Sequence, residues 1–192
     1  VRTEYDAQGR LARLVDAAGN PVDLIHDTDN STESVKDALG NITTFKYDER
    51  GNVVEEANTL GGITKRAYDG NNFMTGETDP LGRTTTFTYD GDGNVLARTD
   101  ALGNATRNSY VTLSPGGLFA RIRGARPTTL LATSTDPLGN TTQNTYDGSG
   151  NLIATTDAAG NVTRYSYDSA GNQTSITDAA GKVTKFDYDG AG

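Results

Sequence analysis

Carboxylates at fixed spacing are the groups in this chain that could do chemistry. Asp90, Asp92 and Asn94 alternate with glycines, and such oxygen donors are the ligands that Ca²⁺ prefers. A helix-loop-helix calcium loop also needs Gly at its sixth position and Glu at its twelfth, where this chain has Val95 and Ala101. The match to that motif therefore fails. Diffuse calcium binding by aspartate-rich turns is left as the weaker alternative.

Enzymatic chemistry has little to build on in this sequence. His26 is the only histidine and there is no cysteine, which excludes a His-based dyad, a multi-His metal site and thiolate chemistry. Ser and Thr are abundant, but no base accompanies them for nucleophilic work. The Gly-rich pieces are turns and not phosphate cradles, because no helix follows them. We therefore expect no enzyme, no catalytic residue, no bound metal and no cofactor.

The composition favours a thin sheet over a deep core. Hydrophobic residues make up 34% of the 192 residues, and the chain has no Trp, so large apolar side chains are scarce. The net charge of −8 argues against a general binder of nucleic acid or acidic lipid, since both need a basic surface. No apolar run approaches the ~20 residues that span a bilayer. We expect no nucleic-acid partner and no membrane span.

A unit of 21 residues recurs along nearly the whole chain. Its clearest mark is a tyrosine followed by aspartate, which occurs at Tyr5-Asp6, Tyr47-Asp48, Tyr68-Asp69, Tyr89-Asp90, Tyr146-Asp147, Tyr167-Asp168 and Tyr188-Asp189. His26 fills the missing tyrosine slot, so substitution within the repeat is favoured over a catalytic role for this residue. Val111 alone breaks the rule that Asp follows the slot. A fixed period of this length indicates a repeat architecture in which units pack against their neighbours.

Two Asp-x-x-Gly turns punctuate each unit, and they account for fifteen of the 25 acidic residues. The Asp side chain accepts backbone N–H groups at the first position, and Gly tolerates a positive φ at the fourth. One turn has Gly without exception, at Gly19, Gly40, Gly61, Gly82, Gly103, Gly139, Gly160 and Gly181. The other has Asn30, Asn72 and Ser114 in place of some glycines. Asn is the next-best residue for positive φ, which predicts that conformation at Asn30 and Asn72.

The stretches between turns read as strands. Thr43, Phe45 and Tyr47 alternate with other residues, which is the period of a strand with one face of β-branched and aromatic side chains. Residues 53–57 form the second, also strand-like stretch of this unit, and no window has the 3.6-residue period of a helix. Each unit is therefore expected to hold two antiparallel strands. Tyr and Phe of successive units should form ladders across the strands.

Two strands per unit give about 17 strands, more than an open twisted sheet usually holds without curling. We predict an all-β fold, a repetitive antiparallel β-meander that curls into a shell-like or solenoid-like ribbon. Residues 1–192 would form a single array and a piece of a longer one. The exposed edge strands of such a piece predict self-association.

An insertion of 15 residues interrupts the register within residues 111–131. This stretch has no acidic residue and combines apolar with basic side chains, of which we single out Phe119, Arg121, Arg123 and Arg126 as candidate partner contacts. Ser114 and the residues after it, Pro-Gly-Gly, should end any strand there. The plainer interpretation is a long structural loop or an extended hairpin that covers a face of the sheet.

The Tyr-Asp-x-x-Gly spacing, with Asp-x-x-Gly-Asn-x-Thr between, resembles the YD repeats of Rhs proteins. The same repeats occur in toxin-complex C components, bacterial wall-associated proteins and animal teneurins. The resemblance covers every unit from Val1 to Gly192 apart from the insertion. It implies a β-ribbon that spirals into a hollow shell, which in bacterial members holds a variable C-terminal toxin and in teneurins belongs to an adhesion ectodomain. The family's C-terminal core boundary has no counterpart here, so the sequence identifies no toxic activity.

From this resemblance we expect a structural wall segment of a bacterial Rhs-type shell that encapsulates a C-terminal toxin or effector. Its partners would be the remaining shell repeats and the enclosed toxin domain of the parent protein. The alternative is an extracellular adhesion module whose aromatic and Asn-rich faces bind glycans. Either function places the protein outside the cytoplasm, secreted or at the cell surface of a bacterium.

Overall fold

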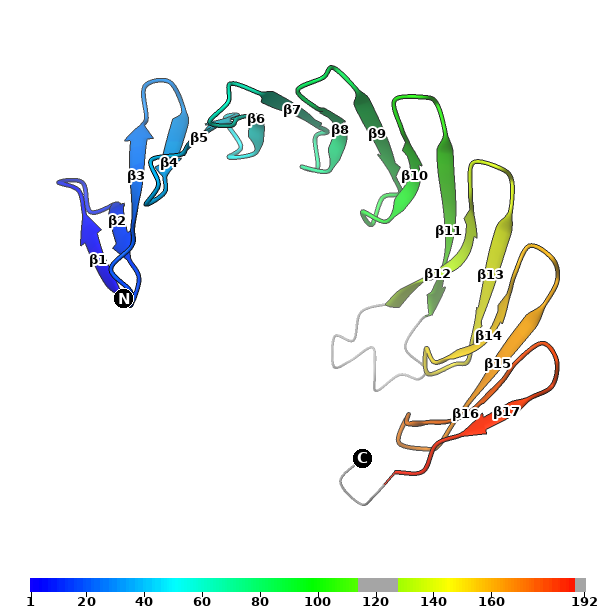
Figure 1. Cartoon of the computed structure of the whole chain (residues 1–192). Coiled ribbons are helices and arrows are strands. Elements are labelled where there is room, and N and C mark those ends of the chain that lie inside the picture. The colour runs from blue at the N-terminus through cyan, green and yellow to red at the C-terminus, as the bar shows by residue number, and fades with distance from the viewer. Residues whose placement is uncertain (114–127, 189–192) are drawn as a thin grey trace, which may run out of the picture. The chain divides into compact units, whose positions relative to one another are not determined.

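The computed structural model describes residues 1–113 and 128–188, which contain seventeen β-strands and no helix (Figure 1). The strands form one antiparallel sheet, which confirms the all-β meander of two strands per unit. They are β1 Arg2–Tyr5, β2 Leu11–Val15, β3 Pro21–Asp27, β4 Thr32–Lys36, β5 Ile42–Tyr47, β6 Val53–Ala57, β7 Ile63–Tyr68, β8 Met74–Thr78, β9 Thr84–Tyr89, β10 Val95–Thr99, β11 Ala105–Leu113, β12 Thr128–Thr135, β13 Thr141–Tyr146, β14 Leu152–Thr156, β15 Val162–Tyr167, β16 Gln173–Thr177 and β17 Val183–Lys185.

The chain divides into two compact units. The first comprises residues 1–87 with 100–102, and the second comprises residues 88–99 with 103–192. Within the first unit, each strand from β1 to β9 pairs with the next along the chain, and β10 to β17 do the same in the second. In a meander, every second connection between consecutive strands lies on the same edge of the sheet. We call the edge with the corners that follow a Tyr or His slot the tyrosine edge.

Most described connections are tight corners with the same backbone pattern, as Asp37 to Asn41 shows. The N–H of Gly40 donates to the Asp37 carbonyl at 3.0 Å, and the N–H of Asp37 donates to the Asn41 carbonyl at 3.0 Å. Gly40 has φ +87°, so the corner is a type I turn followed by a left-handed residue. Nothing lies within 4 Å of a Cβ built on Gly40, so the backbone angle alone selects glycine there.

The predicted positive φ holds for every described glycine at the fourth position of a corner, and it fails at one substituted position. Asn72 has φ +66°, as expected for an Asn in a Gly slot. The prediction for Asn30 is wrong, because the left-handed residue there is Ser31, with φ +54°. The reason is a longer loop: four residues lie between the paired Asp27 and Thr32, whereas three lie between Asp48 and Asn52 in an ordinary corner.

A β-bulge accompanies most tyrosine-edge corners. Lys46 pairs with Glu55 but Tyr47 pairs with Val53, so Val54 is the extra residue of the second strand. The same register shift precedes the slot tyrosine in five other hairpins. The β3–β4 hairpin has no shift. The extra residue that forms the bulge in the other hairpins lies in the loop of this one, so the 21-residue period is kept.

The sheet has no buried core among the residues that the structure describes: every side chain keeps some exposure to solvent. Alternation is nevertheless clear in β7, where Thr64, Arg66 and Tyr68 are half-buried and the residues between them are exposed. The expected aromatic ladder is interleaved rather than continuous. Tyr47 lies opposite Val53 and Tyr68 opposite Met74, because every second strand of the meander is of the other type.

The described flanks of the insertion lengthen one hairpin. β11 and β12 pair beyond Tyr110 through Val111, Thr112 and Leu113, and the usual bulge at Tyr110 is kept. Leu113 and Leu130 reach the next tyrosine-edge corner, since a Cβ built on Gly150 would lie 3.7 Å from a methyl group of each. The insertion thus extends the ribbon without changing the register of the following units.

We predict that Gly160→Ala destabilises the sheet by about 1–2 kcal/mol, the cost of placing a non-glycine residue in the left-handed region. Gly160 has φ +85° and open space around it, so no steric clash contributes. Gly148→Ala is the matched control, because this corner glycine also has open space and no positive φ. Urea unfolding followed by circular dichroism measures both variants. Equal midpoints for the two would contradict this account of the corners.

Candidate functional site

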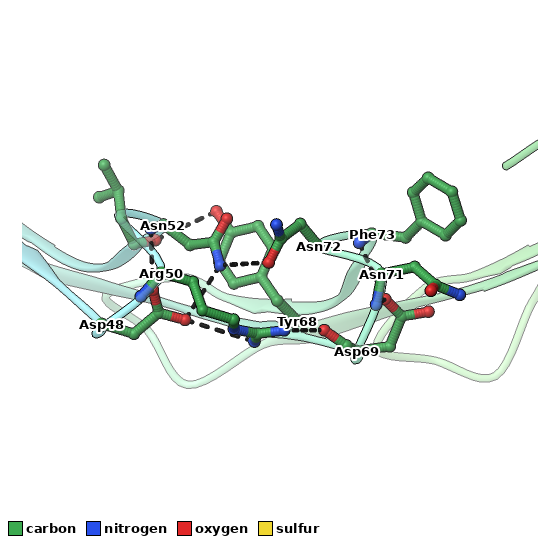
Figure 2. A network of polar contacts seen from close by, with 9 residues as sticks. Asp48, Arg50, Asn52, Tyr68, Asp69, Asn71, Asn72 and Phe73 are labelled. Carbon is green, nitrogen blue, oxygen red and sulfur yellow. Dashed lines mark hydrogen bonds and ion pairs between the residues drawn. The ribbon is translucent and has the colours of Figure 1, made fainter.

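An aspartate carboxylate closes most of the corners, as Asp48 shows (Figure 2). Its Oδ1 accepts the backbone N–H groups of Arg50 and Asn52, both at 2.9 Å, and its Oδ2 accepts the side-chain amide of Asn52 at 3.0 Å. A turn leaves such N–H groups without a strand partner, and the carboxylate supplies one. Where Asn follows the corner Gly, its side-chain amide is therefore the second half of the cap.

Substituted corners keep the same arrangement with other groups. At Asp79 the fifth residue is Arg83, whose guanidinium lies 2.6 Å from Oδ2 of the aspartate. Asn58 replaces the aspartate in another corner, and its Oδ1 accepts the backbone N–H groups of Leu60 at 3.0 Å and Gly62 at 2.9 Å. The corner thus requires an acceptor oxygen at its first position, and a negative charge is not essential.

Neighbouring corners on the tyrosine edge contact each other through polar side chains. The guanidinium of Arg50 donates to the Asp69 carbonyl, and the amide of Asn52 donates to Oδ1 of Asn72 at 3.0 Å (Figure 2). Asn72 is the residue with φ +66°, so it fills the glycine position and also provides this contact. These bonds connect units 21 residues apart in addition to the strand pairing.

The caps change the acidity of the corner carboxylates. Hydrogen bonds from the Asn52 side chain and from the backbone of Asn52 and Arg50 hold the pKa of Asp48 below its ordinary value. The pKa is lowered for the same reason, with the Asn side chain first, at Asp16, Asp37, Asp90, Asp136, Asp147 and Asp157. At Asp6, Asp79 and Asp168 the backbone hydrogen bond is the leading cause. These carboxylates are therefore poor candidates for a general acid at neutral pH.

The tyrosine hydroxyls form the second recurring contact. Five of them donate to the carbonyl of the residue fifteen positions earlier, in the preceding hairpin: Tyr68 to Val53 at 3.1 Å, Tyr110 to Val95 at 2.9 Å, Tyr146 to Leu131 at 2.9 Å, Tyr167 to Leu152 at 3.0 Å and Tyr188 to Gln173 at 2.8 Å. Partial burial raises the pKa of Tyr167, and the neighbouring Tyr165 and Asp147 add to this effect. The hydroxyl therefore stays protonated, as a donor must.

The bulge explains why the hydroxyl is needed. Next to the bulged strand β6, the ladder with β7 has only three residue pairs and ends at Glu55. Strand β4 has no bulge, and its ladder with β5 has five pairs. There the backbone N–H of Tyr47 donates to the Ser31 carbonyl at 2.9 Å. A bulge thus shortens the next ladder, and the tyrosine hydroxyl binds a carbonyl beyond its end.

His26 occupies the tyrosine slot structurally as well as in sequence. Its Nε2 lies 2.8 Å from the Leu11 carbonyl, which is the residue fifteen positions earlier. Its Nδ1 lies 2.8 Å from Oε2 of Glu33 in the next strand. This confirms that His26 is a substitution within the repeat, since the ring makes the contact that a tyrosine hydroxyl makes elsewhere.

We searched the described residues for clusters of side chains that could hold a metal ion. In residues 1–113 and 128–188, no three His, Cys, Asp or Glu side chains converge where an ion could bind. At the calcium-like motif, the Asp90 carboxylate accepts the N–H groups of Asp92 and Asn94 and the Asn94 amide. The same part of the chain includes no helix that is long and apolar enough to cross a membrane.

Of the residues that define the repeat, the described aspartates and glycines lie in the corners, and each described tyrosine of a Tyr-Asp pair lies directly before the corner aspartate. The candidate partner contacts Phe119, Arg121, Arg123 and Arg126 lie outside the described residues, and their role stays a prediction. Sequence reasoning missed the contact between a repeat tyrosine hydroxyl and the carbonyl fifteen residues earlier, which five tyrosines make. It also missed a row of leucines at one edge, although their 21-residue period was visible in the sequence.

Comparison with known proteins matches the family model "RHS Repeat" to residues 26–63, 68–105, 127–160, 146–183 and 167–192, well over half of the chain. A search of curated proteins found no significant match. Similar solved structures include the crystal structure of TcdB2-TccC3-TEV, at 16% identity and a TM-score of 0.35 over 99% of this chain and 15% of that chain. The crystal structure of TcdB2-TccC3 is 15% identical, with a TM-score of 0.34 over 98% and 18%. A Tc holotoxin pore of Photorhabdus luminescens is 14% identical, with a TM-score of 0.36 over 97% and 17%. This chain spans less than a fifth of those chains.

We predict that Tyr167→Phe lowers the free energy of unfolding by about 0.5–1.5 kcal/mol, the net value of a hydrogen bond. The variant removes the bond to the Leu152 carbonyl and keeps the ring. Tyr165→Phe is the control on the same strand and face, and it should cost less. Chemical unfolding of both variants tests the prediction, which fails if Tyr165→Phe is the more damaging change.

We also predict that acid weakens the fold through the capped carboxylates. The pKa values of these aspartates are lower in the folded chain than in the unfolded chain, where the pKa of aspartate is about 3.9. The contribution of these carboxylates to the free energy of unfolding is complete at neutral pH. It is lost as the pH falls from about 4 through the lower pKa values of the folded chain. Asp157→Asn should therefore lower the melting temperature at pH 7 and have a smaller effect at pH 3. Asp29→Asn, outside the first position of a corner, is the control. A deficit of Asp157→Asn that is equal at both pH values would rule out the carboxylate charge as its cause.

Proposed function

Because the chain belongs to the RHS repeat family, we propose that it is a structural wall segment of a bacterial Rhs-type β-shell that encloses a C-terminal toxin or effector. The proposal assigns it no catalysis of its own. In this proposal its partners are the other repeats of the shell and the enclosed domain, and the protein is secreted or lies at the bacterial cell surface.

The absence of a core in the described residues is the observation that carries the proposal. A domain that binds or transforms a ligand by itself usually builds a concave pocket over a packed interior. Here a sheet one layer thick exposes both faces, and its recurring contacts close corners and connect neighbouring strands. A wall needs these properties, because it has to be continuous and has to exclude other molecules over a large area.

The function is steric in this proposal. Each strand inside the array pairs with neighbours on both sides, which leaves few free N–H and C=O groups for another strand to approach. The carboxylate caps occupy the N–H groups at the corners in the same way. A protease or a second protein therefore finds little unpaired backbone along the ribbon.

The glycan-binding alternative has less support. Stacking of sugar rings would use exposed aromatic side chains. The slot tyrosines are needed within the sheet, where their hydroxyls bind carbonyls of the preceding hairpin. Specific, competable binding of the chain on a glycan array would nevertheless favour the alternative over the wall.

Protease protection tests the wall directly. The array is expressed together with the protein segments that its gene encodes on either side, and a broad protease is added. We expect the downstream segment to survive while the array is intact and to be digested at least about tenfold faster when Gly160 and Gly181 are both changed to Ala. The downstream segment alone is the control for intrinsic resistance. Equal digestion with and without the array would refute encapsulation.

A further inference from the structure

His26 has an acceptor oxygen against each of its two ring nitrogens. Nε2 lies 2.8 Å from the Leu11 carbonyl at the start of β2, and Nδ1 lies 2.8 Å from Oε2 of Glu33 in β4. A carbonyl and a carboxylate only accept hydrogen bonds, and a neutral imidazole has a single N–H to donate. Both contacts are therefore hydrogen bonds at the same time only when the ring is doubly protonated and positively charged.

Solvent screens the pair of His26 and Glu33 only in part, since their side chains are 16% and 28% exposed. They line a recess of about 310 Å³ together with two other charged side chains, Arg10 and Asp27. Arg10 donates to Oδ2 of Asp6 at 2.8 Å, and Asp27 is held by its own corner. Glu33 is therefore the carboxylate that the ring of His26 contacts.

Tyr47 of β5 lines the same recess. Partial burial, and in second place the charge of Glu33, raise the pKa of Tyr47, so its hydroxyl stays neutral near neutral pH. Along β2 and β3, Arg13 and Asp23 form an ion pair with each other. An imidazole is the side chain that ordinarily changes its charge between about pH 5 and 8, so His26 is the titrating member of this recess.

The contact with Leu11 lies where strand pairing has stopped. The ladder of β2 with β3 has three residue pairs and ends at Arg13 and Asp23, next to the bulge of the preceding hairpin. In later hairpins a tyrosine hydroxyl spans the equivalent place, as Tyr68 and Tyr167 do. A neutral hydroxyl donates whatever the pH near neutrality. Here the donor is a ring nitrogen, so the contact depends on the protonation of the ring.

We propose that His26 makes the joint between the β1–β2 and β3–β4 hairpins sensitive to pH. In acid the imidazolium donates to both the Leu11 carbonyl and Glu33, and it joins β2, β3 and β4 near the tyrosine edge. When the ring loses its proton, one nitrogen presents a lone pair to an oxygen, so one of the two contacts breaks. This contribution to stability is therefore present in acid and is lost as the pH rises through the range in which imidazoles titrate.

Urea unfolding at pH 5.5 and at pH 8 tests the proposal, because the capped aspartates remain ionised over this range. Between the two pH values, the ratio of folded to unfolded wild-type chain should fall at least about fivefold relative to His26→Tyr, which is the net value of one hydrogen bond. The variant places the usual tyrosine in the slot. A wild-type pH dependence no larger than that of His26→Tyr overturns the proposal.

Glu33→Gln separates the protonation of the ring from the presence of the contact. Its amide donates to an unprotonated Nδ1 and its carbonyl accepts from a protonated one, so this variant should lose the extra pH dependence. Glu49→Gln is the matched control, because it removes an exposed carboxylate of the same compact unit and should keep the wild-type behaviour. A Glu33→Gln chain with the full pH dependence of the wild type refutes the role of the pair.

Nitrogen-15 spectroscopy supplies the second measurement, since the chain has a single histidine and gives one pair of ring signals. Both ring nitrogens of the folded wild-type chain should carry a proton at pH 5.5, and one of them should have lost it at pH 8. Circular dichroism of all variants checks that the sheet is intact. A ring that has the same protonation state at both pH values refutes the proposal.

Discussion

The carboxylate cap of the corner is the interaction on which the rest of this structure depends. A sheet without a buried core cannot rely on apolar burial to hold its strands in register, so register has to be set locally. Asp37, for example, fixes its corner by accepting two backbone N–H groups and the side-chain amide of Asn41. The left-handed Gly completes the reversal. Stability is then shared among nearest neighbours, as is typical of repeat proteins.

The β-bulge and the slot tyrosine together form a second recurring feature of the repeat. The bulge bends a strand and shortens its ladder with the next one, and the tyrosine hydroxyl binds a carbonyl beyond the ladder's end. The exception supports the coupling. Where β4 lacks the bulge, its ladder with β5 is longer and a backbone N–H extends it. Local geometry and the choice of side chain therefore change together.

Substitutions in the repeat preserve chemical roles and not residue identities. His26 replaces a tyrosine and contacts the equivalent carbonyl, Asn58 replaces an aspartate and accepts the same N–H groups, and Asn72 replaces a glycine in the left-handed region. The leucines differ from these residues, because no hydrogen bond or backbone angle of the corner depends on them.

The sequence by itself determined the period, the two strands per unit, the corner glycines and the acceptor role of Asp, because all of these are local and repeat often. It also identified the substituted slot at His26. Tertiary structure decided what depends on neighbours: the interleaving of tyrosines with aliphatic residues, the bulge, the hydroxyl contact fifteen residues back and the shift of positive φ from Asn30 to Ser31. These features follow from strand register, which one unit cannot reveal. Register is set only when a hairpin pairs with the next one.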